Sequence, residues 1–252
     1  MKGFAPHVGV PIVMDHHERA ATDPSLLMVL PLPPVNVFSG AILLTRPHVH
    51  VELACKRAID IVISIVALIL VSPFAIVIAI VIRVTSEGPA IFRQQRIGRN
   101  GEVFTMLKFR TMRDDTQTLI HNDAALWDIY VAHDYKLPNG HQQITRVGFV
   151  LRKLSLDEIP QFINVLRGDM GAVGVRPIEP AQFASRPVSS QHAYCRLRPG
   201  LTGLWQVEGR SSVACVDRVA LDDRYVTTWT IGSDVKLLAR TPLSVLRVNR
   251  TC

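Results

Sequence analysis

The sequence predicts an α/β (α+β) cytosolic domain, built from a β-hairpin and amphipathic helices, that is joined to an N-terminal helical membrane anchor. Three observations predict it: an apolar run at residues 61–82, an Asn-Gly dipeptide between two strand-like segments, and later apolar residues at helical spacing. We therefore divide the chain into a flexible lead at 1–50, the anchor at 51–85 and the domain at 86–252.

The composition restricts the class of partner. The 252 residues suffice for one substantial core, and the net charge of +7 indicates an anionic partner, either lipid, phosphorylated substrate or nucleic acid. Aromatic residues make up only 6% and do not alternate with arginines as a base-stacking surface requires, so we expect no nucleic acid. The four cysteines lack disulfide or zinc spacing, which fits a reducing, cytosolic setting.

The lead carries five of the nine histidines and a proline cluster, without helical or strand periodicity. We expect the pairs His16-His17 and His48/His50 to be solvated rather than metal-binding. The prolines make the apolar patch at 26–44 a poor second membrane span.

The anchor is apolar from 61 to 82 except for Ser64, Ser72 and Pro73. As one helix these positions would reach about 33 Å, enough to cross a hydrocarbon core of about 30 Å. Proline removes a backbone donor, so we expect a kink or break at Ser72-Pro73, and each half alone would be too short to cross.

Positive charge flanks both ends of this run, at Lys56, Arg57, Arg83, Arg93 and Arg96. Cations on both sides indicate that both ends face the cytoplasm, as in a re-entrant hairpin of two half-helices. Hydropathy alone favours an ordinary kinked transmembrane helix equally. Asp60, near the start of the run, is expected to reach the interface or pair with Arg57.

The predicted hairpin has strands at 90–97 and 102–109, joined through Asn100-Gly101, which favours the positive dihedrals of a tight turn. Lys108 and Arg110 would point to the same strand face, where one phosphate can meet both. The alternative is a solvated, cationic edge that discourages aggregation.

Asp157 and Glu158 are the strongest candidates for chemistry. The chain looks helical from Thr145 onward, and the two acids fall at the start of a helix. Its buried face would carry Ile159, Phe162, Ile163 and Leu166, and Gly168 would close it. One interpretation is a capping box between Ser155 and Glu158. The other is an anion site near Arg152 and Lys153, where a phosphate meets a carboxylate in attacking range and a divalent cation can bridge the two.

Two glycine-rich segments follow. In 168–177, three glycines at every third position predict a tight loop whose amides can cradle a phosphate, with Arg176 as a bidentate clamp. In 198–210, Trp205 is either a core residue or a platform for a nucleobase. Amphipathic helices are expected at 213–229 and 233–248, and the second can lie on the membrane surface.

The order of these segments resembles the bacterial sugar transferase family, the monotopic phosphoglycosyl transferases that load a sugar phosphate onto polyprenyl phosphate. The likeness runs from Lys56 to about Thr241 and rests on these motifs: Lys56-Arg57-x-x-Asp60, Ser72-Pro73, Gly88-Pro89, Lys108-Phe109-Arg110-Thr111-Met112, Ser155-Leu156-Asp157-Glu158 with Pro160-Gln161, Arg176-Pro177 and Pro199-Gly200-x-Thr202-Gly203.

The resemblance implies an enzyme of exopolysaccharide biosynthesis that takes a UDP-sugar donor and a polyprenyl (undecaprenyl) phosphate acceptor at the bacterial inner membrane, facing the cytoplasm. It implies that Asp157 attacks the β-phosphate, expels UMP and carries the hexose phosphate, of galactose or glucose type, before lipid displaces it. Glu158 would assist with Mg2+ or a proton. The cations Lys108, Arg110, Arg152 and Arg176 would hold phosphates, and Ser72-Pro73 would make the anchor re-entrant, in contact with membrane lipid.

Three positions depart from the family pattern: Gly171, Val175 and Glu208. They can alter loop rigidity or sugar choice, whereas the acidic pair is intact. Two rival functions remain: a glycosyl transferase that releases UDP, and a membrane-bound partner protein without turnover. The sugar is not specified by any motif, and a homo-oligomer is left open.

Overall fold

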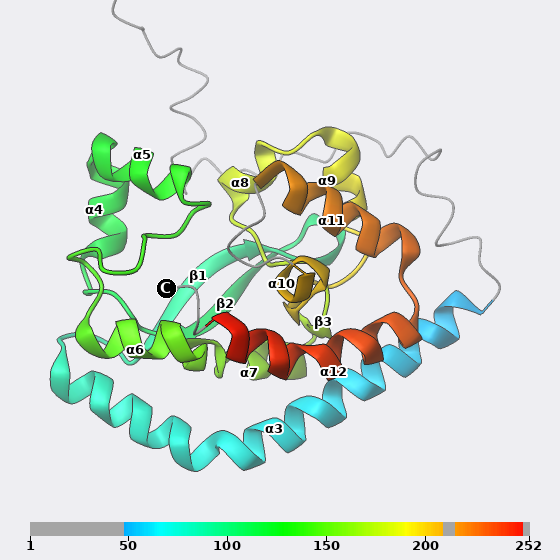
Figure 1. Ribbon diagram of the computed structural model, residues 1–252, viewed down its shortest axis with the longest axis horizontal. Coiled ribbons are helices and arrows are strands. Elements are labelled where there is room, and N and C mark those ends of the chain that lie inside the picture. The colour runs from blue at the N-terminus through cyan, green and yellow to red at the C-terminus, as the bar shows by residue number, and fades with distance from the viewer. Residues whose placement is uncertain (1–47, 209–214, 249–252) are drawn as a thin grey trace, which may run out of the picture. The chain divides into compact units, whose positions relative to one another are not determined.

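The structure is a computed structural model that describes residues 48–208 and 215–248. Nearly all of the predicted lead, with His16-His17 and the proline cluster, therefore lies outside the described residues. The helix and strand labels below are those of Figure 1.

Helix α3 (Val49–Thr85) forms the anchor, and it runs through Pro73 without interruption. The predicted break is thus not present, although the helix is visibly bowed (Figure 1). Pro73 has no N–H for the carbonyl of Ile69, one turn earlier, and the Ser72 hydroxyl donates to that oxygen instead, at 3.1 Å. Ser72 thus satisfies the acceptor that its neighbour leaves free, and the helix continues.

One face of α3 packs on the rest of the domain. Ile82 joins a cluster with Phe109, Leu151 and Ile159, and partly buried positions of the helix extend it: Val71, Ala75, Ile78 and Ala79. Large apolar side chains on the remaining surface of α3 are exposed: Val62, Ile65, Val66, Ile69, Leu70, Phe74, Ile76, Val77 and Ile80. By length and composition α3 can cross a membrane, and its apolar surface is far too exposed for the core helix of a soluble protein.

The predicted hairpin is confirmed. Strands β1 (Ile91–Ile97) and β2 (Val103–Phe109) pair antiparallel, and the connection η1 (Arg99–Gly101) places Asn100 at φ 59° and Gly101 at φ 79°. The face that carries Lys108 also carries Gln94 and Arg96 from β1.

Helix α7 (Gln161–Arg167) covers the free edge of β2. The Asn164 side chain accepts from the N–H of Leu107 at 2.9 Å and donates to the carbonyl of Thr105 at 2.8 Å, so it pairs with β2 as a strand would. The helix ends at Gly168 with φ 97°, as predicted. Its predicted apolar face is only partly right, because the polar Asn164 turns inward and leaves Ile163 exposed.

A second, parallel sheet occupies the glycine-rich segments. Strand β3 (Gly171–Val173) pairs with β4 (Gly200–Thr202). The N–H groups of Gly171 and Gly174 donate to carbonyls of Pro199 and Thr202, at 2.8 and 2.9 Å. The predicted phosphate-cradling loop is therefore wrong, since these amides are used in strand pairing.

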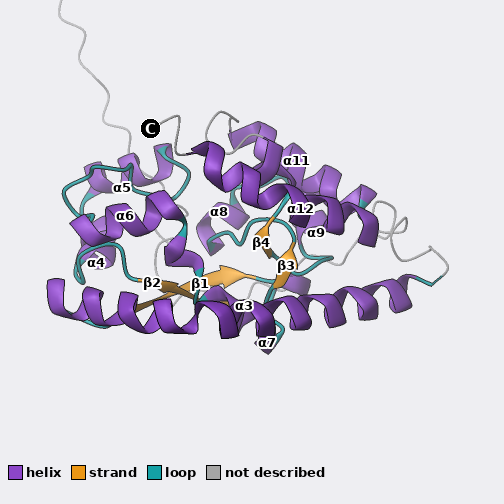
Figure 2. Cartoon of the chain, turned by 60° about the horizontal axis from the view of Figure 1, so that its bottom comes forward, coloured by secondary structure: helices purple, strands orange, loops and turns teal. Residues whose placement is uncertain are grey.

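The remaining helices surround these two sheets. Their bounds are α4 (Thr116–Asn122), α5 (Ala124–Ala132), α6 (Arg146–Leu154), α8 (Pro180–Ala184), α9 (Val188–Tyr194), α10 (Leu204–Glu208), α11 (Cys215–Thr228) and α12 (Ile231–Val248). Helix α6 begins as predicted at Thr145, whose hydroxyl accepts from the N–H of Gly148. In both views, α8 and α11 lie across the sheets from α3 (Figure 2).

Candidate functional site

Asp157 and Glu158 lie on a short 3-10 turn, η2 (Leu156–Glu158), between α6 and α7. Ser155 ends α6 in the left-handed region, at φ 57°, and its side chain caps neither helix. The capping-box interpretation is thus wrong. Helix α7 begins only after Pro160, so the two acids are not part of its first turn. Neither carboxylate is needed to complete a helix, and both remain available for other work.

Three cations and one acid act electrostatically on Asp157. Burial raises the pKa of its carboxyl above the ordinary value, and the neighbouring Glu158 raises it further. Lys108, Lys136 and Arg152 oppose this by favouring the ionised form. The acidic pair therefore sits in a half-buried site that combines negative charge with converging positive charge, as a phosphate-handling centre requires.

Arg152 is fixed by two hydrogen bonds. Its Nε donates to the Thr111 hydroxyl at 2.9 Å and its Nη1 to the Leu137 carbonyl at 3.1 Å. Burial lowers the pKa of its guanidinium, and the charge of Asp157 opposes this. The adjacent Lys153 is exposed on α6, so only one of the two cations predicted near the acids acts on Asp157.

Lys108 approaches the acidic pair from β2, where it lies opposite Phe92. Burial lowers the pKa of its ammonium to about 8, although Glu158 and Asp157 favour the charged form. The cationic Arg96 and Arg176 lower it further. An ammonium with this pKa is charged at neutral pH but close to losing its proton.

Lys136 is a site residue that the sequence reasoning missed. It follows Asp134 and Tyr135, both in the left-handed region at φ 59° and 56°, and this turn directs the chain back to the acidic pair. Its pKa is lowered by desolvation and by Arg176 and Arg152. The sequence of segment 121–141 is polar and without clear period, and it indicates a helix and a loop but singles out no lysine.

Arg110 does not lie with Lys108 at the acidic pair. Strand β2 ends at Phe109, so the alternation expected to align Lys108 with Arg110 does not continue. The buried guanidinium of Arg110 donates from Nη2 to the carbonyl and hydroxyl oxygens of Ser86, both at 2.9 Å. This arginine holds the chain that follows α3, and the structure does not bring it to the acidic pair.

Arg176 connects the acidic pair with Trp205. Its charge lowers the pKa values of Lys108 and Lys136, while its guanidinium lies over the Trp205 ring, 5.4 Å from the centroid. Trp205 is only 6% exposed, and the guanidinium of Arg218 also lies over it, at 5.0 Å. The ring is therefore a buried support for two arginines and not an open platform for a base.

The Lys-Arg-x-x-Asp motif at the start of the anchor has a structural role. Lys56 is buried and its Nζ lies 3.6 Å from Asp60 and 2.7 Å from Asp234, whereas Arg57 donates to the carbonyls of Val165 and Leu166. The expected pairing of Asp60 with Arg57 is wrong. Both cations have partners within the domain, so they are not free interfacial charges.

The structure shows the contacts of the three positions that depart from the family pattern. A Cβ at Gly171 would lie 3.0 Å from a carboxylate oxygen of Asp60, so glycine leaves room for this acid against β3. Val175 is buried and its carbonyl accepts from the N–H of Gly200. Glu208 reaches Arg224 at 3.7 Å across the surface.

A magnesium ion fits the chemistry of the acidic pair. No group of three His, Cys, Asp or Glu side chains able to hold a metal occurs within the two described ranges. Mg2+ does not need one, because it commonly uses one or two carboxylates and completes its shell with waters and substrate phosphates. Asp157 and Glu158 are adjacent carboxylates of this kind.

Comparison with known proteins defines the class to which this fold and site belong. Residues 51–248 match the family described as bacterial sugar transferase. The undecaprenyl-phosphate galactose phosphotransferase of Salmonella typhimurium is 40% identical over 247 residues, which cover 92% of this chain and 50% of the relative. The exopolysaccharide production protein ExoY of Sinorhizobium fredii is 39% identical over 191 residues, covering 74% of this chain and 83% of the relative.

A third relative is the UDP-glucose:undecaprenyl-phosphate glucose-1-phosphate transferase of Caulobacter vibrioides, 39% identical over 209 residues, covering 79% of this chain and 72% of the relative. The chain spans half the length of the Salmonella protein. The chain belongs to the bacterial sugar transferase family.

Proposed function

We propose that this chain transfers a hexose 1-phosphate, of galactose or glucose type, from a UDP-sugar to polyprenyl phosphate, as the first membrane step of exopolysaccharide synthesis. One observation carries the proposal: an acidic pair with no capping role lies among Lys108, Lys136 and Arg152. The names of the relatives, which include transferases of galactose phosphate and glucose 1-phosphate to undecaprenyl phosphate, support the same chemistry.

In the first step, a carboxylate oxygen of Asp157 attacks the β-phosphorus of the donor. A bond forms between this oxygen and phosphorus, the bond from phosphorus to the bridging oxygen breaks, and UMP leaves with that electron pair. Lys108, Lys136 and Arg152 neutralise charge on the phosphates and thereby stabilise the transition state.

In the second step, a phosphate oxygen of the lipid attacks the same phosphorus. The acyl phosphate bond to Asp157 breaks, the carboxylate is regenerated, and the product is a lipid-linked diphosphosugar. Glu158, the adjacent carboxylate, would assist with Mg2+ or with a proton. Mg2+ bound by Asp157 and Glu158 would supply further positive charge to the donor phosphates.

We also propose that α3 is a re-entrant anchor that places the domain on the cytoplasmic face of the inner membrane. Lys56 and Arg57, near its N-terminal end, bind the domain, and so do Ile82 and the following Ser86 near its C-terminal end. A straight spanning helix would place these ends on opposite sides of the bilayer, where one domain cannot hold both. The exposed apolar surface between them would face lipid.

The test uses the Asp157→Asn variant, which keeps the shape of the side chain and loses the nucleophile. Purified full-length protein would receive UDP-galactose or UDP-glucose, undecaprenyl phosphate and Mg2+, and both the released nucleotide and the lipid product would be identified. We expect UMP from the wild type, a phosphosugar adduct on the peptide that contains Asp157, and neither from the variant.

Other outcomes would reject the proposal in distinct ways. Release of UDP in place of UMP would indicate transfer of the sugar without its phosphate. Full transfer by Asp157→Asn would exclude a covalent role for this residue. Normal polysaccharide initiation in cells that carry only this variant would favour a partner protein without turnover.

A further inference from the structure

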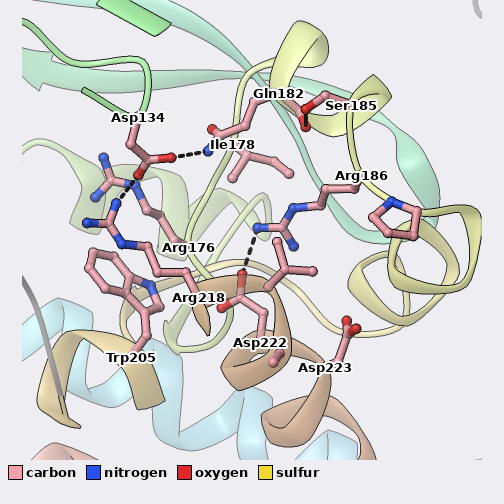
Figure 3. Close-up of a pocket in the computed structure, with 13 residues that line it drawn as sticks. Asp134, Arg176, Ile178, Gln182, Ser185, Arg186, Trp205, Arg218, Asp222 and Asp223 are labelled. Carbon is pink, nitrogen blue, oxygen red and sulfur yellow. Dashed lines mark hydrogen bonds and ion pairs between the residues drawn. The ribbon is translucent and has the colours of Figure 1, made fainter. Parts of the chain in front are cut away.

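A cavity that has no role in the steps above includes Arg176 in its wall. It has a volume of about 390 Å3 and is formed by the loop after α5, by α8 and the chain that follows it, by α10 and by α11. Figure 3 shows the residues that line it. We call it the Arg186 pocket, after the buried cation at its centre. Its size is within the range of small-molecule sites.

Arg186 has hydrogen-bonding capacity that the described residues do not use. It is only 8% exposed, and its Nη2 donates to Asp222 on α11 at 2.8 Å. Its Nε and Nη1 have no hydrogen-bond partner in the described part of the chain. Figure 3 shows the guanidinium pointing toward Asp222 among the lining residues. Buried donors without partners are rare, so this pair of N–H groups indicates a missing ligand.

Acceptors and apolar surface lie beside these donors. Asp223 lines the same pocket and its buried Oδ1 also lacks a partner among the described residues. Ile178, Val219 and Pro187 supply apolar surface, and Arg218 and Gln182 converge on Asp134 at the opposite wall. The pocket therefore suits a flat, uncharged ligand with both carbonyl acceptors and an N–H donor on its edge.

Uracil is such a ligand: its edge presents one N–H between two carbonyl oxygens. A guanidinium can donate to a carbonyl and a carboxylate can accept from the N–H, while the apolar residues contact the faces of the ring. A hexose, in contrast, needs hydroxyl partners around its whole circumference, and the apolar part of this lining does not provide them.

The position of the pocket also favours the nucleoside. Arg176 lines the pocket and acts on Lys108 and Lys136 at the acidic pair, so one side chain connects the two sites. In-line displacement places the leaving group on the side of phosphorus opposite the nucleophile. The leaving UMP would then extend from Asp157 past Arg176 into the pocket.

The location of the Arg186 pocket relative to the anchor α3 also favours the nucleoside as its ligand. Helices α8 and α11, which contribute to the pocket, lie across the sheets from α3 (Figure 2). The sugar phosphate must remain near the membrane, where the lipid accepts it, whereas the nucleotide is released to water. A pocket on the far side suits the released part of the donor.

We infer that the Arg186 pocket binds the uridine of the donor, with Arg186 and Asp223 at the uracil edge and Arg176 at the α-phosphate. This inference rests on the proposed function for the identity of the donor. Asp134 and Lys136 then belong to one loop that contacts both ends of the nucleotide, the base through the pocket wall and the phosphates through the acidic pair.

The test measures equilibrium binding and needs no turnover. UMP, uridine and glucose 1-phosphate would be titrated into the full chain in nanodiscs by calorimetry. Val219→Phe fills the pocket from α11, and Val131→Phe adds the same volume at an exposed position of α5 outside the pocket. We expect Val219→Phe to raise the dissociation constants of UMP and uridine at least tenfold and to change that of glucose 1-phosphate by less than twofold. Val131→Phe should bind all three ligands as the wild type does.

A second measurement covers the case in which Val219→Phe fails to fold. Irradiation of wild-type protein with 5-iodo-UMP should label peptides that contain Trp205 or residues 218–223, and excess UMP should prevent it. Unchanged UMP affinity in folded Val219→Phe, a loss confined to glucose 1-phosphate, or labelling confined to α3 and α6 would each overturn the assignment.

The pocket and the proposed reaction can fail separately. The Asp157→Asn variant should bind UMP as tightly as the wild type if the pocket holds uridine. Wild-type protein that binds UMP in the pocket but yields no UMP from a UDP-sugar would reject the reaction and keep the pocket. If the wild type releases UMP during turnover but Val219→Phe has no effect on UMP binding, the reaction is kept and the pocket assignment is rejected.

Discussion

Lys56 and Asp234 lie 178 positions apart in the sequence and form a buried ion pair, with 2.7 Å between Nζ and Oδ2. The pair joins the membrane helix α3 to α12. The same ammonium donates to the carbonyl of Val173 on β3 at 2.9 Å. One lysine thus holds the anchor, the small parallel sheet and the last helix together.

Replacing Lys56 with methionine should strongly destabilise the domain. The change leaves Asp60 and Asp234 buried without their cation, and breaking such a pair on one side costs about 3–5 kcal/mol. Thermal unfolding in detergent measures this as a lowered midpoint. Lys236→Met on the exposed surface of α12 is the matched control and should change little. Equal midpoints for the two variants would contradict the structural role of Lys56.

The pH dependence of donor use should report Lys108. Its pKa is lowered to about 8, so its charge is present below this pH and is lost as pH rises through it. We expect kcat/KM for the donor to fall above about pH 8, up to tenfold per unit. Lys108→Arg stays charged and should abolish this alkaline decline. If kcat/KM of Lys108→Arg still falls above pH 8 as in the wild type, the decline is due to another titrating group.

Removing the charge of Lys136 should affect Asp157 directly. Lys136 lowers the pKa of the Asp157 carboxyl, so Lys136→Gln should raise this pKa, and the proposed nucleophile should then become protonated at a higher pH. The acid side of the kcat/KM profile should therefore move to higher pH, and the KM for the donor should increase. Lys153→Gln, an exposed lysine of α6, should do neither. If both variants behave alike, Lys136 has no special place in the site.

Gly174→Ala should separate the strands of the parallel sheet. An added Cβ would lie 2.4 Å from the carbonyl oxygen of Arg198 and 2.6 Å from the N of Gly200, and these backbone atoms have little freedom to move. We expect a loss of about 1–3 kcal/mol of folding free energy. Gly232→Ala on α12 meets only a distant Thr230 hydroxyl and serves as the control. Similar unfolding midpoints for the two variants would show that β3 and β4 can separate at no cost.

Local features of the fold were predictable because short-range chemistry specifies them. Asn100-Gly101 adopts the positive dihedrals that its residue types favour, Thr145 caps α6, and Gly168 ends α7. Each of these depends on atoms within about four residues, which the sequence displays directly.

Features that depend on distant partners were not predictable. The polar Asn164 faces inward because it bonds to the edge of β2, 57 and 59 positions away. The glycines at 171 and 174 are used in pairing with β4, whereas composition alone indicated a loop for phosphate.

The candidate site was predictable in part for the same reason. Asp157, Glu158 and Arg152 are close in sequence, so their proximity follows from local structure. Lys136 reaches them through a left-handed turn, and Arg110 leaves them because β2 ends one residue earlier. The positions of Lys136 and Arg110 depend on where the backbone turns. No local sequence pattern at either residue indicates such a turn.

The apolar cluster of Ile82, Phe109, Leu151 and Ile159 includes the last turns of the membrane helix and the residue two positions after Asp157. With α3 in the membrane as proposed, this packing would hold the Asp157 carboxylate at a constant height relative to the lipid headgroups. An acceptor phosphate at that level would then reach it by lateral diffusion within the leaflet, and neither the lipid nor the domain would have to travel along the membrane normal.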